Sequence, residues 1–133
     1  MKQEKIFKYI LIIICVIAAI YFLIIENRIT FTSITADEAI AKLENDSSII
    51  LLDVRTLEEY QEKRIPNSIL IPIDNLRSRV LTEIEDKETR IFVYCGTGVR
   101  SKDAAGILVN LGYERVYNLG GIDEWKYETE SGP

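Results

Sequence analysis

The stretch "RIFVYCGTGVRSKDAAGILVNL", Arg90 to Leu111, joins two patterns of different period. Its first part, "RIFVY", is a short apolar run rich in aromatic and β-branched residues, which is typical of a buried strand. From Ser101 onward, apolar residues recur at helical spacing, and Gly112 supplies a C-terminal stop. The stretch therefore predicts a strand, a tight loop and a helix in direct succession, with Cys95 where the strand ends.

Strand and helix patterns alternate through the rest of the chain. Further strands are predicted at 49–54, 68–73 and 115–119, and helices at 36–43, 57–63 and 75–81. Thr35 and Thr56 each precede a glutamate by three residues, the spacing of a capping box, and Asp74 is the expected cap of the third helix. "GG" at 120–121 is predicted to be a turn, and "IDEW" a final helical turn. This alternation predicts an α/β fold with a mostly parallel sheet, helices on both faces and ligands at the carboxyl ends of the strands.

The N-terminal stretch "IFKYILIIICVIAAIYFLII", residues 6–25, is almost wholly apolar. At ~1.5 Å per residue, about 20 helical residues span the ~30 Å hydrocarbon core of a bilayer. We therefore expect a transmembrane anchor over 1–27, an α/β domain over 28–126 and a polar tail over 127–133 that frays. A cleaved signal peptide is the alternative for the first segment, although its apolar run continues beyond any small-residue cleavage site.

Charge is unevenly distributed along the chain. Lys2, Lys5 and Lys8 precede or begin the apolar stretch, whereas Arg28 and then Lys42 follow it. This favours a single-pass protein of the cell membrane with a cytoplasmic N-terminus and a domain outside the cytoplasm. From residue 26 onward the chain has 20 acidic and 13 basic residues, a formal charge of −7, which argues against nucleic-acid binding.

Two residue types exclude several classes of site. The chain has two cysteines, one of them Cys15 in the apolar stretch, so no disulfide framework is expected. Histidine is absent, which excludes a hydrolase with a histidine base and the commonest zinc sites. We expect neither a metal nor a cofactor.

The loop after Cys95 has the composition of an anion-binding site. Gly96 and Gly98 permit positive φ and close approach, so that successive backbone N–H groups can point at one spot, and the helix dipole and Arg100 add positive charge. A cysteine in that position has its thiolate stabilised without a histidine base. Two other interpretations are an inert buried cysteine and half of a dinucleotide fingerprint, but Ser101 occupies the place of the fingerprint's third glycine.

Two longer stretches carry a resemblance to a known family. "LLDVRTLEEYQEKRIPNSILIPID", 51–74, and "VYCGTGVRSKDAAGILVNLGYERVYNLGGIDEW", 93–125, resemble the sequence hallmarks of a rhodanese domain. The resemblance extends from about residue 34 to residue 125 and implies a three-layer rhodanese-like fold. The chain has Lys63-Arg64 and Asn67-Ser68 where many members have Gly-His and Gly-Ala. We expect these differences to affect a surface that binds partners more than the activity.

The resemblance implies a sulfurtransferase. Cys95 would take the outer sulfur of a small anionic donor such as thiosulfate, become a persulfide and pass the sulfur to a thiol, a cyanide-like acceptor or a protein. Arg100 would orient the sulfur, Arg55 would add positive potential for the donor, and Asp53 would brace a loop arginine. The residues expected to bind the sulfur are those of the loop, Gly96, Thr97, Gly98, Val99 and Arg100, with Ser101 in support.

Two alternatives accompany this reading. Four residues separate Cys95 from Arg100, and by the resemblance this short loop goes with sulfur transfer, whereas relatives acting on phosphate or arsenate have one residue more. A phosphatase-type or arsenate-type activity is therefore the lesser enzymatic alternative. A sulfur carrier or adaptor without turnover, serving a membrane or surface partner, is the alternative from another class.

Overall fold

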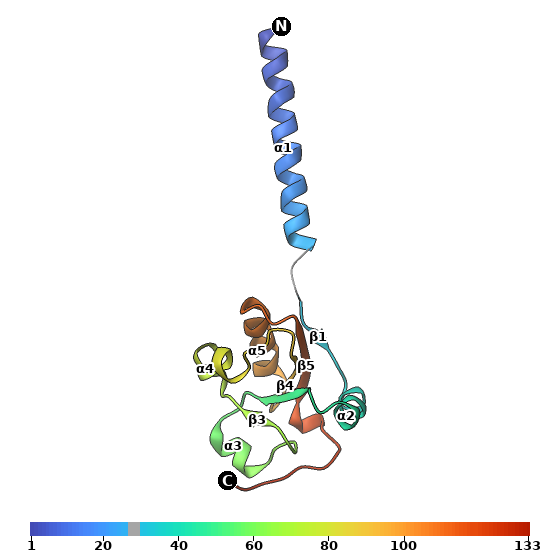
Figure 1. Cartoon of the computed structure of the whole chain (residues 1–133), viewed down its shortest axis with the longest axis vertical. Coiled ribbons are helices and arrows are strands. Elements are labelled where there is room, and N and C mark those ends of the chain that lie inside the picture. The colour runs from blue at the N-terminus through green and yellow to red at the C-terminus, as the bar shows by residue number, and fades with distance from the viewer. Residues whose placement is uncertain (27–29) are drawn as a thin grey trace.

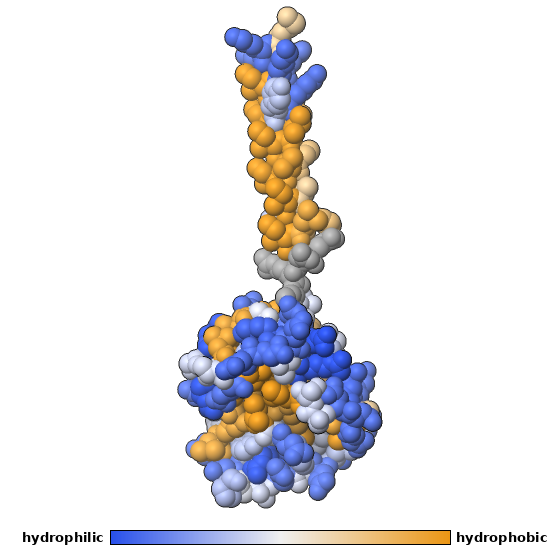
Figure 2. Space-filling model, viewed as in Figure 1, coloured by the Kyte–Doolittle hydropathy of each residue, from blue (hydrophilic) through white to orange (hydrophobic). Residues whose placement is uncertain are grey.

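The computed structural model describes residues 1–26 and 30–133. The first helix, α1, extends over Lys2–Glu26 and lies apart from the domain (Figure 1). Its surface is apolar over most of its length (Figure 2), and Lys2–Ile25 is long and apolar enough to cross a membrane, a property that a signal sequence shares. The expected boundary between anchor and domain, 27/28, lies outside the described residues.

The domain is built on a parallel sheet. In the described part of the chain it has five strands in the order β1-β5-β4-β2-β3, every neighbouring pair parallel. The strands are β1 (Thr32–Ser33), β2 (Ile50–Asp53), β3 (Ile69–Leu70), β4 (Arg90–Cys95) and β5 (Arg115–Gly121). The helices are α2 (Ala36–Asn45), α3 (Leu57–Glu62), α4 (Leu76–Glu83) and α5 (Val99–Asn110), with 3₁₀ turns η1 (Ile73–Asn75) and η2 (Ile122–Glu124).

Helices cover both faces of the sheet, as predicted. Alternate residues of β4 enter two separate cores: Val93 packs in one with α4 and α5, whereas Phe92 packs in the other with α2 and η2. Because both faces are buried, the strand reads as an uninterrupted apolar run. The three-layer α/β architecture expected from the sequence is confirmed.

Local signals had mixed outcomes. Both capping boxes form, since Glu38 and Glu59 bond back to Thr35 and Thr56. Asp74 lies inside η1 instead of capping α4, whose N-cap residue Asn75 makes no side-chain cap bond. The short strand β1 was not predicted.

Several element boundaries differ from the prediction, and one predicted turn is absent. The predicted strand 68–73 shrinks to β3, and α5 begins two residues before Ser101. The predicted glycine turn is wrong, because Gly120 and Gly121 continue β5 opposite the end of β4, beyond a register shift at Val93/Tyr94.

The polar tail does not fray. Arg64 and Glu130 exchange both backbone hydrogen bonds at 2.9 Å, and the Gly132 N–H donates to the Gln61 carbonyl at 2.8 Å. The Arg64 side chain adds an ion pair to Glu130 at 3.0 Å and a bond to the Gly132 carbonyl at 2.6 Å. The expectation of fraying rested on the absence of periodicity, which says nothing about backbone pairing with a distant turn.

Candidate active site

Cys95 is the last residue of β4, at the carboxyl end of the sheet. It lies between β2 and β5 in strand order and pairs with Gly121. Its side chain belongs to the core that α5 covers, and only 1% of the residue is exposed. The thiol is therefore held at the base of the loop that follows.

The loop turns back over the sulfur at Gly98. This residue has φ +103°, a left-handed conformation that strains any residue with a side chain, and its N–H donates to Cys95 Sγ at 3.0 Å. Ser101, fully buried, donates from Oγ to the Gly98 carbonyl at 3.1 Å. Because this N–H belongs to the N-cap residue of α5, the positive end of the helix dipole lies on the side of the sulfur. Gly98 is the one loop amide bonded to Sγ in the described part of the chain.

The end of β5 forms the floor of the loop. A Cβ on Gly121 would lie 2.4 Å from the Gly96 carbonyl oxygen and 2.9 Å from Thr97 backbone atoms, so only glycine fits. The Asp123 N–H donates to the same Gly96 oxygen at 3.2 Å. The loop therefore packs directly against the backbone of β5. This close approach is possible because Gly121 has no side chain.

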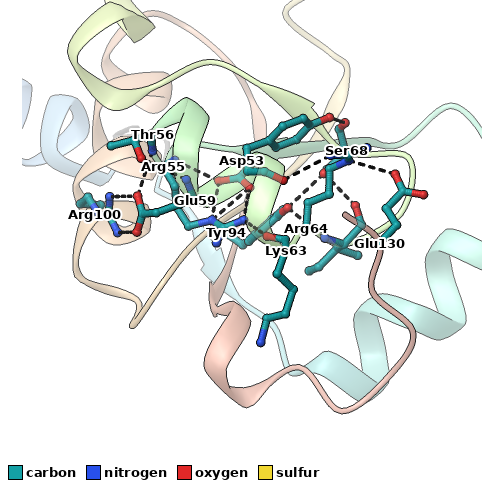
Figure 3. Close-up of polar contacts among 12 residues, drawn as sticks. Asp53, Arg55, Thr56, Glu59, Lys63, Arg64, Ser68, Tyr94, Arg100 and Glu130 are labelled. Carbon is teal, nitrogen blue, oxygen red and sulfur yellow. Dashed lines mark hydrogen bonds and ion pairs between the residues drawn. The ribbon is translucent and has the colours of Figure 1, made fainter. Parts of the chain in front are cut away.

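Arg100 crosses the loop and is held by Glu59 of α3. Two parallel hydrogen bonds of 2.8 Å join the guanidinium to the carboxylate (Figure 3). A Cβ on Gly96 would lie 3.3 Å from Arg100 Nη2, so Gly96 serves close approach and not positive φ, which it lacks. The Arg100 guanidinium and the Thr56 N–H lower the pKa of Glu59 to about 2, against burial, which raises it. The pair thus stays ionised well into the acid range.

The predicted brace between Asp53 and a loop arginine is wrong. Asp53, fully buried, instead binds Arg55 two residues on, with the carboxylate 2.7–3.1 Å from Nε and Nη2 (Figure 3). Arg55 is 4% exposed and also donates to the Lys63 carbonyl at 2.6 Å. Its charge is paired inside the domain, which does not match the role predicted for it in donor binding.

The remaining predicted residues line the outside of the loop. Thr97 and Val99 are exposed, Val99 by 69%. Within residues 1–26 and 30–133, no group of three or more carboxylates, cysteines or histidines is placed to hold a metal ion.

Sequence reasoning missed three contributors to the site. Glu59 was recognised only as a capping residue, and Gly121 and Asp123 only as parts of a turn. An acidic residue three positions after Thr56 satisfies the capping rule completely, so nothing local signals that its carboxylate also binds Arg100.

Comparisons with known proteins agree with this fold. The family model described as "Rhodanese-like domain" matches residues 35–128. The Escherichia coli thiosulfate sulfurtransferase PspE is 37% identical over 73 residues, covering 55% of this chain and 70% of PspE. YrkF of Bacillus subtilis, whose name proposes a sulfur carrier protein, is 32% identical over 106 residues, covering 79% of this chain and 56% of YrkF. A solved rhodanese-like domain protein from Staphylococcus aureus is 32% identical with a TM-score of 0.66, covering 77% of this chain and all of that one.

A family model that matches most of the chain, together with a shared fold, settles the class. The chain belongs to the rhodanese-like domain family and is related to proteins named as thiosulfate sulfurtransferases.

Proposed function

We propose that the chain is a sulfurtransferase that works through a persulfide on Cys95. The thiolate attacks the outer sulfur of a donor such as thiosulfate, a new S–S bond forms, and sulfite leaves with the electron pair of the broken bond. A thiophilic acceptor, cyanide or a thiolate, then attacks the outer persulfide sulfur and releases the Cys95 thiolate. The observation that carries the proposal is the Gly98 N–H, 3.0 Å from Cys95 Sγ at the start of α5.

The other loop residues have separate roles in this proposal. The amides from Gly96 to Arg100 hold the outer sulfur as its charge changes, because preorganised N–H groups stabilise an anion without rearranging. Glu59 holds the Arg100 guanidinium beside the loop, where Arg100 orients the sulfur. Asp53 and Arg55 fix the end of β2, and Ser101 fixes the carbonyl of Gly98.

The six-residue loop supports sulfur over larger oxyanions. By likeness to the family, a loop of this length accepts one sulfur atom, and the relatives that take phosphate or arsenate have a longer one. The Cys95–Arg100 spacing therefore favours sulfur transfer over phosphatase or arsenate chemistry.

The proposed setting is a membrane. Residues 6–25 of α1 would lie in lipid as a retained single-pass anchor, and the lysines before it would keep the N-terminus in the cytoplasm with the domain outside. N-terminal sequencing of the protein purified from membranes separates a retained anchor from a cleaved signal. Protease added to intact cells should remove the domain, and a protected domain would reverse the orientation.

The reaction is tested by mixing the full-length protein, in nonionic detergent, with thiosulfate and cyanide. Thiocyanate should accumulate with the wild-type chain and with Cys15→Ser, but not with Cys95→Ser. Equal activity of Cys95→Ser would refute Cys95 as the nucleophile.

A sulfur carrier or adaptor is the second candidate, favoured by the similarity to YrkF. It predicts that thiocyanate forms very slowly from free donors, whereas a persulfidated protein partner loads Cys95 readily. The Lys63-Arg64 corner gives it less support than the sequence suggested, because Arg64 binds the chain's own tail.

A further inference from the structure

A groove of about 570 Å³ lies on the side of the domain that carries α2. Its walls are α2 with the connection to β2 on one side, and the turn before β3 and the C-terminal segment on the other; Figure 1 shows that segment passing from η2 toward the end of α3. Its floor is apolar and is made by Ile40, Leu43, Ile49, Leu51, Ile65 and Trp125. The volume is within the range of ordinary ligand and peptide sites.

This groove is separate from the Cys95 loop. Its floor residues Ile49 and Ile65 belong to the core under α2, whereas Cys95 belongs to the core under α5, on the opposite face of the sheet. Ile49 precedes β2 and Ile65 precedes β3, so the groove opens near the amino ends of these strands, while Cys95 stands at a carboxyl end. An occupant of the groove would leave the loop uncovered.

The C-terminal wall of the groove is fixed in place at both ends. Beside α2, Asp37 forms an ion pair with Lys126 at 2.8 Å and accepts a hydrogen bond from the Tyr127 hydroxyl. Farther along, Glu130 pairs with Arg64. The groove is therefore formed before anything binds, which lowers the entropy lost on binding.

The rim of the groove carries one sign of charge. Glu44, Asp46 and Glu128 line it, and none of its lining residues is Lys or Arg. Asp46 has a partner in Arg90 at 3.4 Å, but within 1–26 and 30–133 neither Glu44 nor Glu128 has an ion pair. Three cations adjoin the lining residues in sequence: Arg64 and Lys126 already bind carboxylates of the domain itself, and Lys42 of α2 is in no ion pair within the described residues.

We propose that this groove binds a segment of a partner protein in which lysine or arginine flanks apolar side chains. The apolar floor provides the burial, and the carboxylates of Glu44 and Glu128 provide the complementary charge. These carboxylates and the formal charge of −7 from residue 26 onward both disfavour binding of an acidic partner segment. The proposal does not depend on the proposed sulfur chemistry, because the groove and the loop share no residue.

Trp125 reports on the groove directly. It is the one tryptophan in the chain and forms part of the floor. The full-length protein in nonionic detergent is titrated with acetyl-Lys-Leu-Leu-Lys-amide while tryptophan fluorescence is recorded. Acetyl-Glu-Leu-Leu-Glu-amide and acetyl-Lys-Ser-Ser-Lys-amide serve as matched peptides that lack the charge or the apolar part.

The expected result is a saturable fluorescence change with the first peptide alone, weakened by added salt. Glu44→Gln and Glu128→Gln should each lower the affinity about two- to fivefold, as expected for an exposed ion pair. Glu85→Gln, an exposed carboxylate outside the groove, should leave the affinity unchanged, and so should Cys95→Ser, whose sulfur chemistry is absent. No change with any peptide, equal binding of the acidic or the serine peptide, or insensitivity to both groove substitutions would overturn the proposal.

Discussion

Gly121→Ala tests whether the close packing of the loop on β5 holds the Gly98 N–H in hydrogen-bonding position to Cys95 Sγ. The new Cβ would lie 2.4 Å from the Gly96 carbonyl oxygen, whereas real Cβ contacts are essentially never below 3.0 Å. The loop backbone must therefore rise by roughly 0.6 Å or more, which lengthens and misaligns the hydrogen bond from the Gly98 N–H to Cys95 Sγ, 3.0 Å in the wild type. Overpacking of this kind destabilises by about 1–3 kcal/mol, and a displacement near 1 Å in a catalytic site lowers the rate by up to about 100-fold.

Gly120→Ala is the matched control. Gly120 has φ +87° but nothing within 4 Å of its missing Cβ, so alanine strains the backbone by about 1–2 kcal/mol and leaves the loop untouched. Urea unfolding should therefore show similar losses for the two variants, whereas thiocyanate formation should fall steeply only in Gly121→Ala. Equal rates of thiocyanate formation in both variants would refute the claim that Gly121 determines the position of the loop.

Three further predictions concern the charges around the loop and the helix that follows it. Glu59→Gln should lower thiocyanate formation, because it loosens Arg100. It should also make the free energy of unfolding depend less on pH: the pKa of Glu59 is lowered to about 2, so its ion pair stabilises the wild-type fold above about pH 4.5 and is lost as the pH falls toward 2. Unfolding curves recorded from pH 5 to pH 2 measure this difference. Asp53→Ala leaves the buried Arg55 without its partner and should cost about 3–5 kcal/mol in urea unfolding, more than Glu59→Gln, whose pair is partly exposed. Gly106→Ala, inside α5 with open space around the new Cβ, should raise the free energy of unfolding by about 0.5–1 kcal/mol without changing activity.

The sequence predicted those features that depend on local pattern. Apolar runs marked the buried strands, capping boxes marked the starts of α2 and α3, and the strand-to-helix transition around Cys95 placed the thiol at the carboxyl end of the sheet. In a parallel sheet these signals are enough, because the topology brings that end and the start of the following helix together.

The features it missed depend on contacts between distant segments. Asp53 binds Arg55 and not a loop arginine, and the carboxylate that binds Arg100 is Glu59, for which the sequence predicted only a capping role. The tail joins Arg64 through backbone bonds, which carry no composition signal. Gly121 appeared to be a turn residue because its function, leaving room for the Gly96 carbonyl, is visible only once both segments are in place.

The central claim is that Cys95 accepts and carries one sulfur atom. Intact-mass analysis of the full-length protein after exposure to thiosulfate, followed by removal of the excess, measures this directly. We predict a gain of one sulfur atom in the wild type and in Cys15→Ser, reversed by cyanide, and no gain in Cys95→Ser. A wild-type chain whose mass stays unchanged with thiosulfate and with a persulfidated donor protein, or a Cys95→Ser variant that gains the atom, would contradict it.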